Sequence, residues 1–220
     1  MPGKFKPKRM RRVRRNRKIK RSRTTLVNNS ALRPFASRFI TKMKYSTTLS
    51  DAGTGAPYFF NLNSIHDPDR TGVGHQPYGH DSMEAIYNRY RVISCSYVVT
   101  AYNAGSPLRF AVIPSNTATS LGNVSTVCEN PRARFAIQYP GGNTKMIKGK
   151  CYIPALVGRN KTQYMSDDDY QAAFGSSPNE LAVLGIYSAG TLDGPLNGTS
   201  ITVTLEYTVE CYDVRILPVS

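Results

Sequence analysis

The last part of the sequence alternates strictly between apolar and polar side chains, and this run restricts the possible folds more than any other feature. From Ile201 to Cys211 every second residue is apolar, and the residues between are Thr or Glu. A period of two residues over about twelve positions is typical of a β-strand with one buried face. A weaker alternation recurs earlier in the chain. The chain is therefore expected to be built mainly from half-buried strands.

Eight segments carry strand signals, and helical patterns are confined to the connections between them. The eight segments are 37–48, 58–62, 90–103, 107–113, 132–139, 144–154, 181–188 and 200–216. Pro114 is expected to end the fourth strand. Eight antiparallel strands with long, unequal loops predict an all-β sandwich, either a jelly roll or a relative of it.

Two helical segments are expected in the connections. Asp81 and Glu84 have the spacing of an N-cap and its N3 partner, so a helix is predicted to begin there. Its expected apolar face consists of Met83, Ile86, Tyr87 and Tyr90. The polar segment 155–180 is predicted to be a loop with one helical turn around Asp167 to Phe174.

Positive charge is concentrated at the start of the chain. Residues 1–50 contain 17 Lys or Arg and no acidic residue, whereas residues 51–220 contain 12 basic and 14 acidic residues. Such a segment repels itself and buries little, so residues 1–36 are predicted to be a disordered arm that binds nucleic acid. Residues 37–220 are predicted to form the folded domain. The candidate phosphate-binding residues are Lys4, Lys6, Lys8, Arg9, Arg11, Arg12, Arg14, Arg15, Arg17, Lys18, Lys20, Arg21 and Arg23.

Other functional classes have little support in the sequence. No catalytic motif, cofactor motif or secretory signal stands out, and the longest apolar stretch is too short to span a bilayer. The four cysteines lack zinc-site spacing and are expected to be reduced, small apolar residues. Two groups could suggest a metal, but a structural loop explains the first better and acids at a helix start explain the second, so no metal site is predicted. They are the His66–Asp81 loop and Asp167–Asp169.

Several passages together resemble one known group of proteins. They are the Lys/Arg arm from Lys4 to Arg23, residues 58–65 leading into 67–77, residues 78–92, and the Thr-rich strand from Ile201 to Val214. These passages are similar to the single-jelly-roll capsid proteins of circovirus-like (CRESS-DNA) viruses, which package circular single-stranded DNA. Coat proteins of small single-stranded RNA viruses share the fold and the basic arm, so the genome type stays open.

The resemblance implies a specific arrangement of the strands. Labelled B to I in chain order, strands B, I, D and G would form one sheet and strands C, H, E and F the other. The resemblance also implies an icosahedral shell with the genome inside and the arm directed inward. Symmetry sets the smallest such shell at about 60 copies. The basic clusters Lys8–Arg15 and Arg17–Arg21 would then also serve as a nuclear localisation signal read by a host import receptor.

Self-association requires an interface, and loops 63–80, 115–131 and 155–180 are expected to supply it and to bind an unknown cell-surface receptor. The candidate aromatic anchors are Tyr78, Tyr87, Tyr102, Tyr164, Tyr170 and Phe174. Two other classes of protein fit the sequence less well. A ribosomal-type protein would spread basic charge over its body, and a lectin-like sandwich would not need a basic arm.

Overall fold

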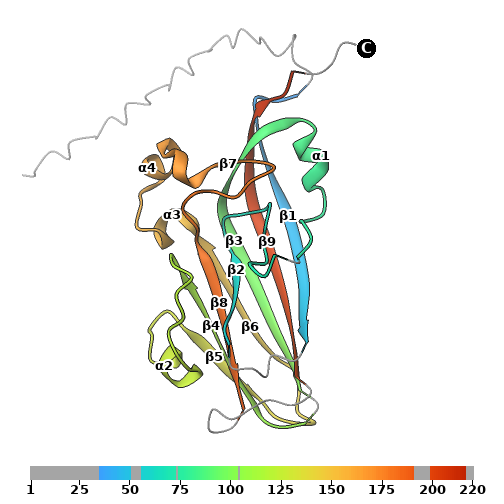
Figure 1. The fold of residues 1–220 in the computed structure, drawn as a ribbon, viewed down its shortest axis with the longest axis vertical. Coiled ribbons are helices and arrows are strands. Elements are labelled where there is room, and N and C mark those ends of the chain that lie inside the picture. Colours follow the sequence, from blue (N-terminus) through green and yellow to red (C-terminus); the bar gives the residue numbers. More distant parts are fainter. Residues whose placement is uncertain (1–34, 51–55, 73, 104, 191–198, 217–220) are drawn as a thin grey trace, which may run out of the picture. The chain divides into compact units, whose positions relative to one another are not determined.

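The computed structural model describes residues 35–50, 56–72, 74–103, 105–190 and 199–216. Two antiparallel sheets pack face to face (Figure 1). The first sheet has the order β1 (Arg38–Ser50), β9 (Thr199–Val214), β3 (Tyr87–Asn103), β6 (Lys145–Tyr152), with the short β7 (Ala172–Ala173) beside β3. The second sheet has the order β2 (Tyr58–Asn61), β8 (Val183–Ala189), β4 (Leu108–Ser115), β5 (Arg134–Gln138).

This order confirms the predicted jelly roll. In the labels B to I, the first sheet reads B, I, D, G and the second reads C, H, E, F. All eight predicted strands are present, and β7 is the additional one. We refer to the two sheets below as the BIDG sheet and the CHEF sheet.

The strand β9 lies at the centre of the BIDG sheet, between β1 and β3. Its alternating apolar residues, from Ile201 to Cys211, are all fully buried, as the sequence pattern predicted. They pack against the inner face of the CHEF sheet, for example against Phe60 and Phe110. The Tyr207 hydroxyl donates a 2.7 Å hydrogen bond to the carbonyl oxygen of Asn61, which joins the two sheets across the core.

The helix predicted from Asp81 is much shorter than expected. It spans only His80–Glu84 (α1), and β3 already begins at Tyr87. The N-cap is Gly79 rather than Asp81, with a φ of 85° that favours glycine. The helical spacing of Tyr87 and Tyr90 was misleading, because both residues pair with the end of β9 and the sheet overrides the local pattern.

Pro114 does not end its strand, contrary to expectation. It lies inside β4, opposite Leu184 of β8. On the other side, the pairing with β5 ends at Val112, so β4 is an edge strand at Pro114. A proline is tolerated there because an edge position needs no N–H donor toward a neighbouring strand.

Short helices fill the connections. They are α2 (Val124–Cys128), α3 (Ile153–Leu156), α4 (Lys161–Ser166) and the 3-10 helix η3 (Asp168–Tyr170). The helical turn expected around Asp167 is only η3, because the chain then turns into β7 and pairs with β3. The helix α4 was not predicted, although Asn160 and Gln163 form a capping box at its start. Within the described residues no helix is both long and apolar enough to cross a bilayer.

Candidate assembly and nucleic-acid surfaces

The basic arm lies outside the described residues. The thirteen candidate phosphate-binding residues from Lys4 to Arg23 therefore stay a prediction, as does the boundary at residue 36. The described chain begins with Phe35 and leads at once into β1. The first described strand that follows the arm in sequence is therefore β1.

The outward face of the BIDG sheet carries a group of lysines. On β1 the side chains of Met43 and Tyr45 are buried, and the residues that alternate with them are exposed. The same alternation holds on β6, where Ile147 and Cys151 are buried. The exposed lysines that alternate with the buried residues on these two strands are Lys42, Lys44, Lys148 and Lys150, whereas the exposed Lys145 at the start of β6 is in phase with Ile147.

Strand pairing places these lysines on one face, although they come from opposite edges of the four main strands. Lys44 pairs with Glu206 of β9, Glu206 pairs with Ser96 of β3, and Ser96 pairs with Lys150 of β6. Directly opposite residues in antiparallel strands point to the same side of a sheet. Lys44 and Lys150 therefore flank Glu206 in one row across the sheet, which we call the lysine face together with Lys42 and Lys148.

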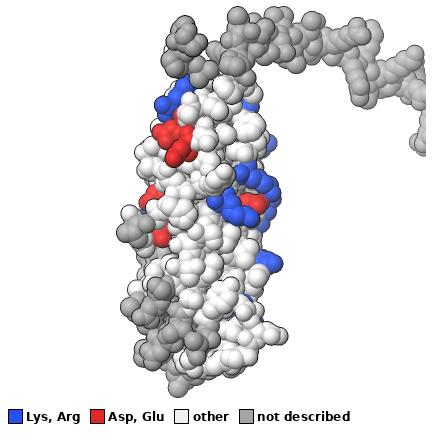
Figure 2. Space-filling view, turned by 90° about the vertical axis from the view of Figure 1, so that its right-hand side faces the viewer, with Lys and Arg blue, Asp and Glu red and all other residues white. Residues whose placement is uncertain are grey.

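The single carboxylate inside this row does not neutralise it. The Lys42 Nζ atom lies 2.7 Å from Glu206 Oε1. The pKa of Glu206 is lowered, chiefly by this hydrogen bond and further by the charges of Lys42, Lys44 and Lys150. Three ammonium groups against one carboxylate leave a surplus of two positive charges around Glu206. Basic side chains grouped around an acidic one are visible on the face shown in Figure 2.

A second carboxylate on this face is also paired with a cation. Glu210 is 5% exposed and lies 3.3 Å from the Arg38 guanidinium at the start of β1. It also pairs in register with Arg91 of β3, whose guanidinium lies 5.7 Å from the ring of Tyr212. The Arg38 guanidinium therefore offsets the charge of Glu210, and the positive surplus around Glu206 remains.

The outward face of the CHEF sheet is apolar and partly covered. The helix α2 packs on it through Val124 and Val127, which join Ala111, Ile113 and Tyr187 in a second, smaller core. Beyond α2 lies the edge strand β5, where Phe135 is 57% and Ile137 is 38% exposed. Tyr139, just after β5, is 58% exposed. These three side chains form an apolar edge, which suits contact with another protein surface.

The predicted interface aromatics separate into two groups. Tyr78 and Tyr102 are 95% and 49% exposed, so they are available to a partner. The other four lie in the core of the subunit, and they are Tyr87, Tyr164, Tyr170 and Phe174. The apolar edge was missed, because an alternating strand pattern does not reveal which face will be left uncovered.

The His and Asp side chains of the His66–Asp81 loop make separate local contacts and do not form one cluster. Asp69 accepts a hydrogen bond from the Thr71 backbone, and His66 contacts Gln76. His80 instead lies with Asp81 and Glu84. The Asp167–Asp169 group makes local hydrogen bonds, with the Asp167 carboxylate capping η3 as predicted for acids at a helix start.

All four cysteines are free thiols, as the sequence predicted. Cys95, Cys151 and Cys211 lie on strands and are buried, and Cys128 at the end of α2 is partly exposed. Burial raises the pKa of Cys151 to about 11 and that of Cys211 to about 12. These three thiols therefore act as small apolar core residues rather than as reactive nucleophiles.

The fold resembles several solved virus structures. Cocksfoot mottle virus matches with a TM-score of 0.50 and 12% identity over 81% of this chain and 96% of that chain. Desmodium yellow mottle tymovirus matches with a TM-score of 0.47 and 11% identity over 84% and 94%. Macrobrachium rosenbergii nodavirus matches with 0.48 and 8% over 83% and 56%. No protein-family model and no curated protein matches the sequence. At such identities the resemblance concerns the fold, a jelly-roll sandwich of the kind found in virus structures.

Proposed function

We propose that this chain is the capsid protein of a small icosahedral virus and that its basic side holds a single-stranded nucleic acid genome. The main support is the lysine face, because it gives the BIDG side of the jelly roll a positive surplus in addition to the charge that the sequence of the arm carries. Cations on one side and an apolar edge on the other suit a subunit that binds cargo and also binds copies of itself.

Electrostatics supplies the mechanism. Each Lys or Arg that contacts a phosphate releases a condensed counterion, and this release drives binding. The first 50 residues carry 17 positive charges per chain. A shell of about 60 copies would bring on the order of 1,000 charges to a genome. Arginine outnumbers lysine in the first 23 residues by eight to five, which favours bidentate phosphate contacts.

The sequence resemblance favours circular single-stranded DNA as the cargo, with RNA as the alternative. A DNA genome copied in the nucleus would require import, for which the clusters Lys8–Arg15 and Arg17–Arg21 are suited. The proposed partners are thus other copies of the chain, a genome, a nuclear import receptor and a cell-surface receptor. The proposed locations are the virion and, during assembly, the host nucleus.

Electron microscopy of the purified full-length chain tests this function. Uniform closed particles are expected, and nucleic acid extracted from them should be degraded by DNase and resist RNase. Degradation by RNase alone would keep the capsid function and replace the DNA genome by RNA. A chain that remains monomeric at every salt concentration would refute the capsid function.

A further inference from the structure

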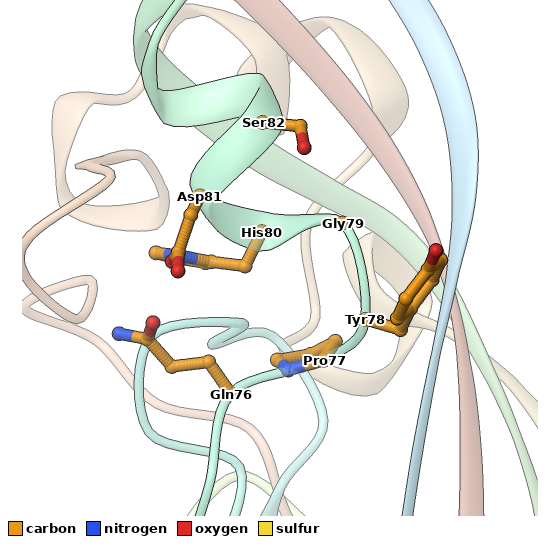
Figure 3. A pocket seen from close by; sticks show the side chains of 7 residues that line it. All are labelled: Gln76, Pro77, Tyr78, Gly79, His80, Asp81 and Ser82. Atoms are coloured by element: carbon orange, nitrogen blue, oxygen red, sulfur yellow. The ribbon is translucent and has the colours of Figure 1, made fainter.

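A buried histidine and two carboxylates meet at α1. His80 is only 1% exposed, whereas the side chains of Asp81 and Glu84 are 89% and 37% exposed. His80 Nδ1 lies 3.1 Å from Asp81 Oδ1 and 3.9 Å from Glu84 Oε2. Figure 3 shows the Asp81 carboxylate lying against the His80 ring at the edge of a pocket.

The other ring nitrogen fixes the protonation of this histidine. His80 Nε2 lies 3.1 Å from the carbonyl oxygen of Phe174, and the contact is buried. A carbonyl oxygen only accepts hydrogen bonds, so Nε2 must carry the proton. In the neutral ring Nδ1 then presents a lone pair, and it faces two carboxylates. A cation between these three electron-rich atoms would contact all of them at once.

We propose that His80, Asp81 and Glu84 bind a divalent cation of the Zn²⁺ class. An imidazole ligand favours such a metal over Ca²⁺ or Mg²⁺, which prefer oxygen ligands only. A histidine that donates its second N–H to a backbone carbonyl is the usual outer-shell arrangement of metal-bound histidines. Here the carbonyl of Phe174 has this role, and it lies 94 residues away from His80 in the sequence.

The distances suit the ion. Bonds of about 2.0–2.2 Å in tetrahedral geometry separate neighbouring ligand atoms by about 3.3 Å. The observed separations of 3.1 and 3.9 Å lie on either side of this value, and all three ligand atoms lie within 4.8 Å of one another. A shift of Glu84 by about half an ångström would bring its oxygen to this distance from His80 Nδ1, and its partly exposed side chain permits such a shift. The adjoining pocket of about 380 Å³, lined by residues 76–82, leaves room for a water as fourth ligand.

Other charges near the site compensate it only in part. The Arg215 guanidinium lies 3.6 Å from Oε1 of Glu84, on the oxygen that does not face His80. A proton on His80 Nδ1 would serve Asp81 but would not reach Glu84 at 3.9 Å. The ring of His66 lies 6.3 Å from the His80 ring, and its Nδ1 is already paired with Gln76.

The ion would tie together segments that are distant in sequence. His80 connects α1 to the chain just after β7 through Phe174, and Glu84 connects it to the end of β9 through Arg215. Metal binding only to the folded chain stabilises it in proportion to the logarithm of the metal concentration. The site is independent of the proposed capsid function, since it lies within one subunit.

Cobalt titration of the full-length chain tests the proposal. After removal of metals with EDTA, Co²⁺ should produce visible absorption bands that saturate at one ion per chain, and Zn²⁺ but not Ca²⁺ should abolish them. Asp81→Asn and Glu84→Gln should each weaken binding by at least about tenfold, the lower limit for outer-shell changes. Both side chains are accessible, so these variants should fold.

Glu129→Gln is the matched control, because Glu129 is an exposed acid after α2 and far from α1 in the sequence. It should bind Co²⁺ as the unchanged chain does. Absence of the absorption bands, or equal binding by the control and both site variants, would overturn the proposal. A chain that binds no Co²⁺ but becomes more stable as histidine is protonated would show a proton in place of the metal, which also overturns it.

Discussion

Lys42 on β1 and Glu206 on β9 form an ion pair of 2.7 Å although they are 164 residues apart in the sequence. The pair forms because β1 and β9 are neighbours in the BIDG sheet and both side chains point outward. Glu206 can neutralise one ammonium group, and Lys44 and Lys150 act on the same carboxylate. The lysine face thus stays cationic, and its charge can be changed one residue at a time.

Removing one lysine should weaken the binding of nucleic acid. We expect Lys44→Gln and Lys150→Gln each to reduce the slope of log K against log salt by about 0.7 for a single strand. Binding of the full-length chain to a labelled DNA oligonucleotide, measured by anisotropy over a range of NaCl concentrations, gives this slope. Lys161→Gln is the control, because Lys161 is exposed on α4 and outside the lysine face. An equal loss in the control would contradict a role for this face.

Removing the carboxylate should have the opposite effect. Glu206→Gln deletes the acid that Lys42, Lys44 and Lys150 share, so these lysines become available to phosphates. We expect tighter binding and a steeper salt dependence in the same anisotropy experiment. Weaker binding by this variant would show that Glu206 positions the lysines for the phosphates instead of competing with them.

The hydrogen bond between the two sheets should contribute to stability. Tyr207→Phe removes the donor to the Asn61 carbonyl and leaves a buried acceptor unpaired, which should cost about 1–3 kcal/mol in the free energy of unfolding. Tyr212→Phe is a matched control, because the buried Tyr212 hydroxyl finds no hydrogen-bond partner among the residues that the structure describes. Urea unfolding of the two variants measures the difference. Equal stability of both would contradict the role assigned to Tyr207.

Alkaline pH should destabilise the folded domain. Burial raises the pKa of Tyr90 to about 12 and raises the pKa of Tyr207 well above its usual value. The folded state thus holds these phenol protons more tightly than the unfolded state does. Their contribution to stability is complete below about pH 10, the pKa of an exposed tyrosine, and is lost as the pH rises toward 12. The urea midpoint should fall over this interval, and a constant midpoint would show that the phenols do not titrate with unfolding.

The strands could be predicted from the sequence wherever one face is buried and the other exposed. For β9 the alternation from Ile201 to Val209 matches burial, because side chains of a strand alternate between two environments, and only the outward-facing Glu210 departs from it by being buried. The helix after Asp81 was predicted too long, because Tyr87 and Tyr90 have a helical spacing that only the pairing with β9 overrides. Pairing partners far away in sequence leave no local signal.

The candidate surfaces were only partly predictable for the same reason. Lys42 and Lys44 alternate with Met43 and Tyr45 in the sequence, but no local pattern predicts that they lie beside Glu206 or Lys150. The proposed cation site also depends on a contact between residues that are distant in the sequence. The Phe174 carbonyl that holds the Nε2 proton of His80 lies 94 residues away, so the spacing of His and Asp residues in the sequence indicated only an irregular cluster and no site.

The nucleic acid content of assembled particles tests the central claim most directly. The full-length chain and a variant that lacks residues 1–23 should be compared by the ratio of nucleic acid to protein absorbance at physiological salt. The account predicts closed particles from the full chain that contain nucleic acid, and a folded shell domain without nucleic acid from the variant. Equal amounts of packaged nucleic acid in both would contradict it.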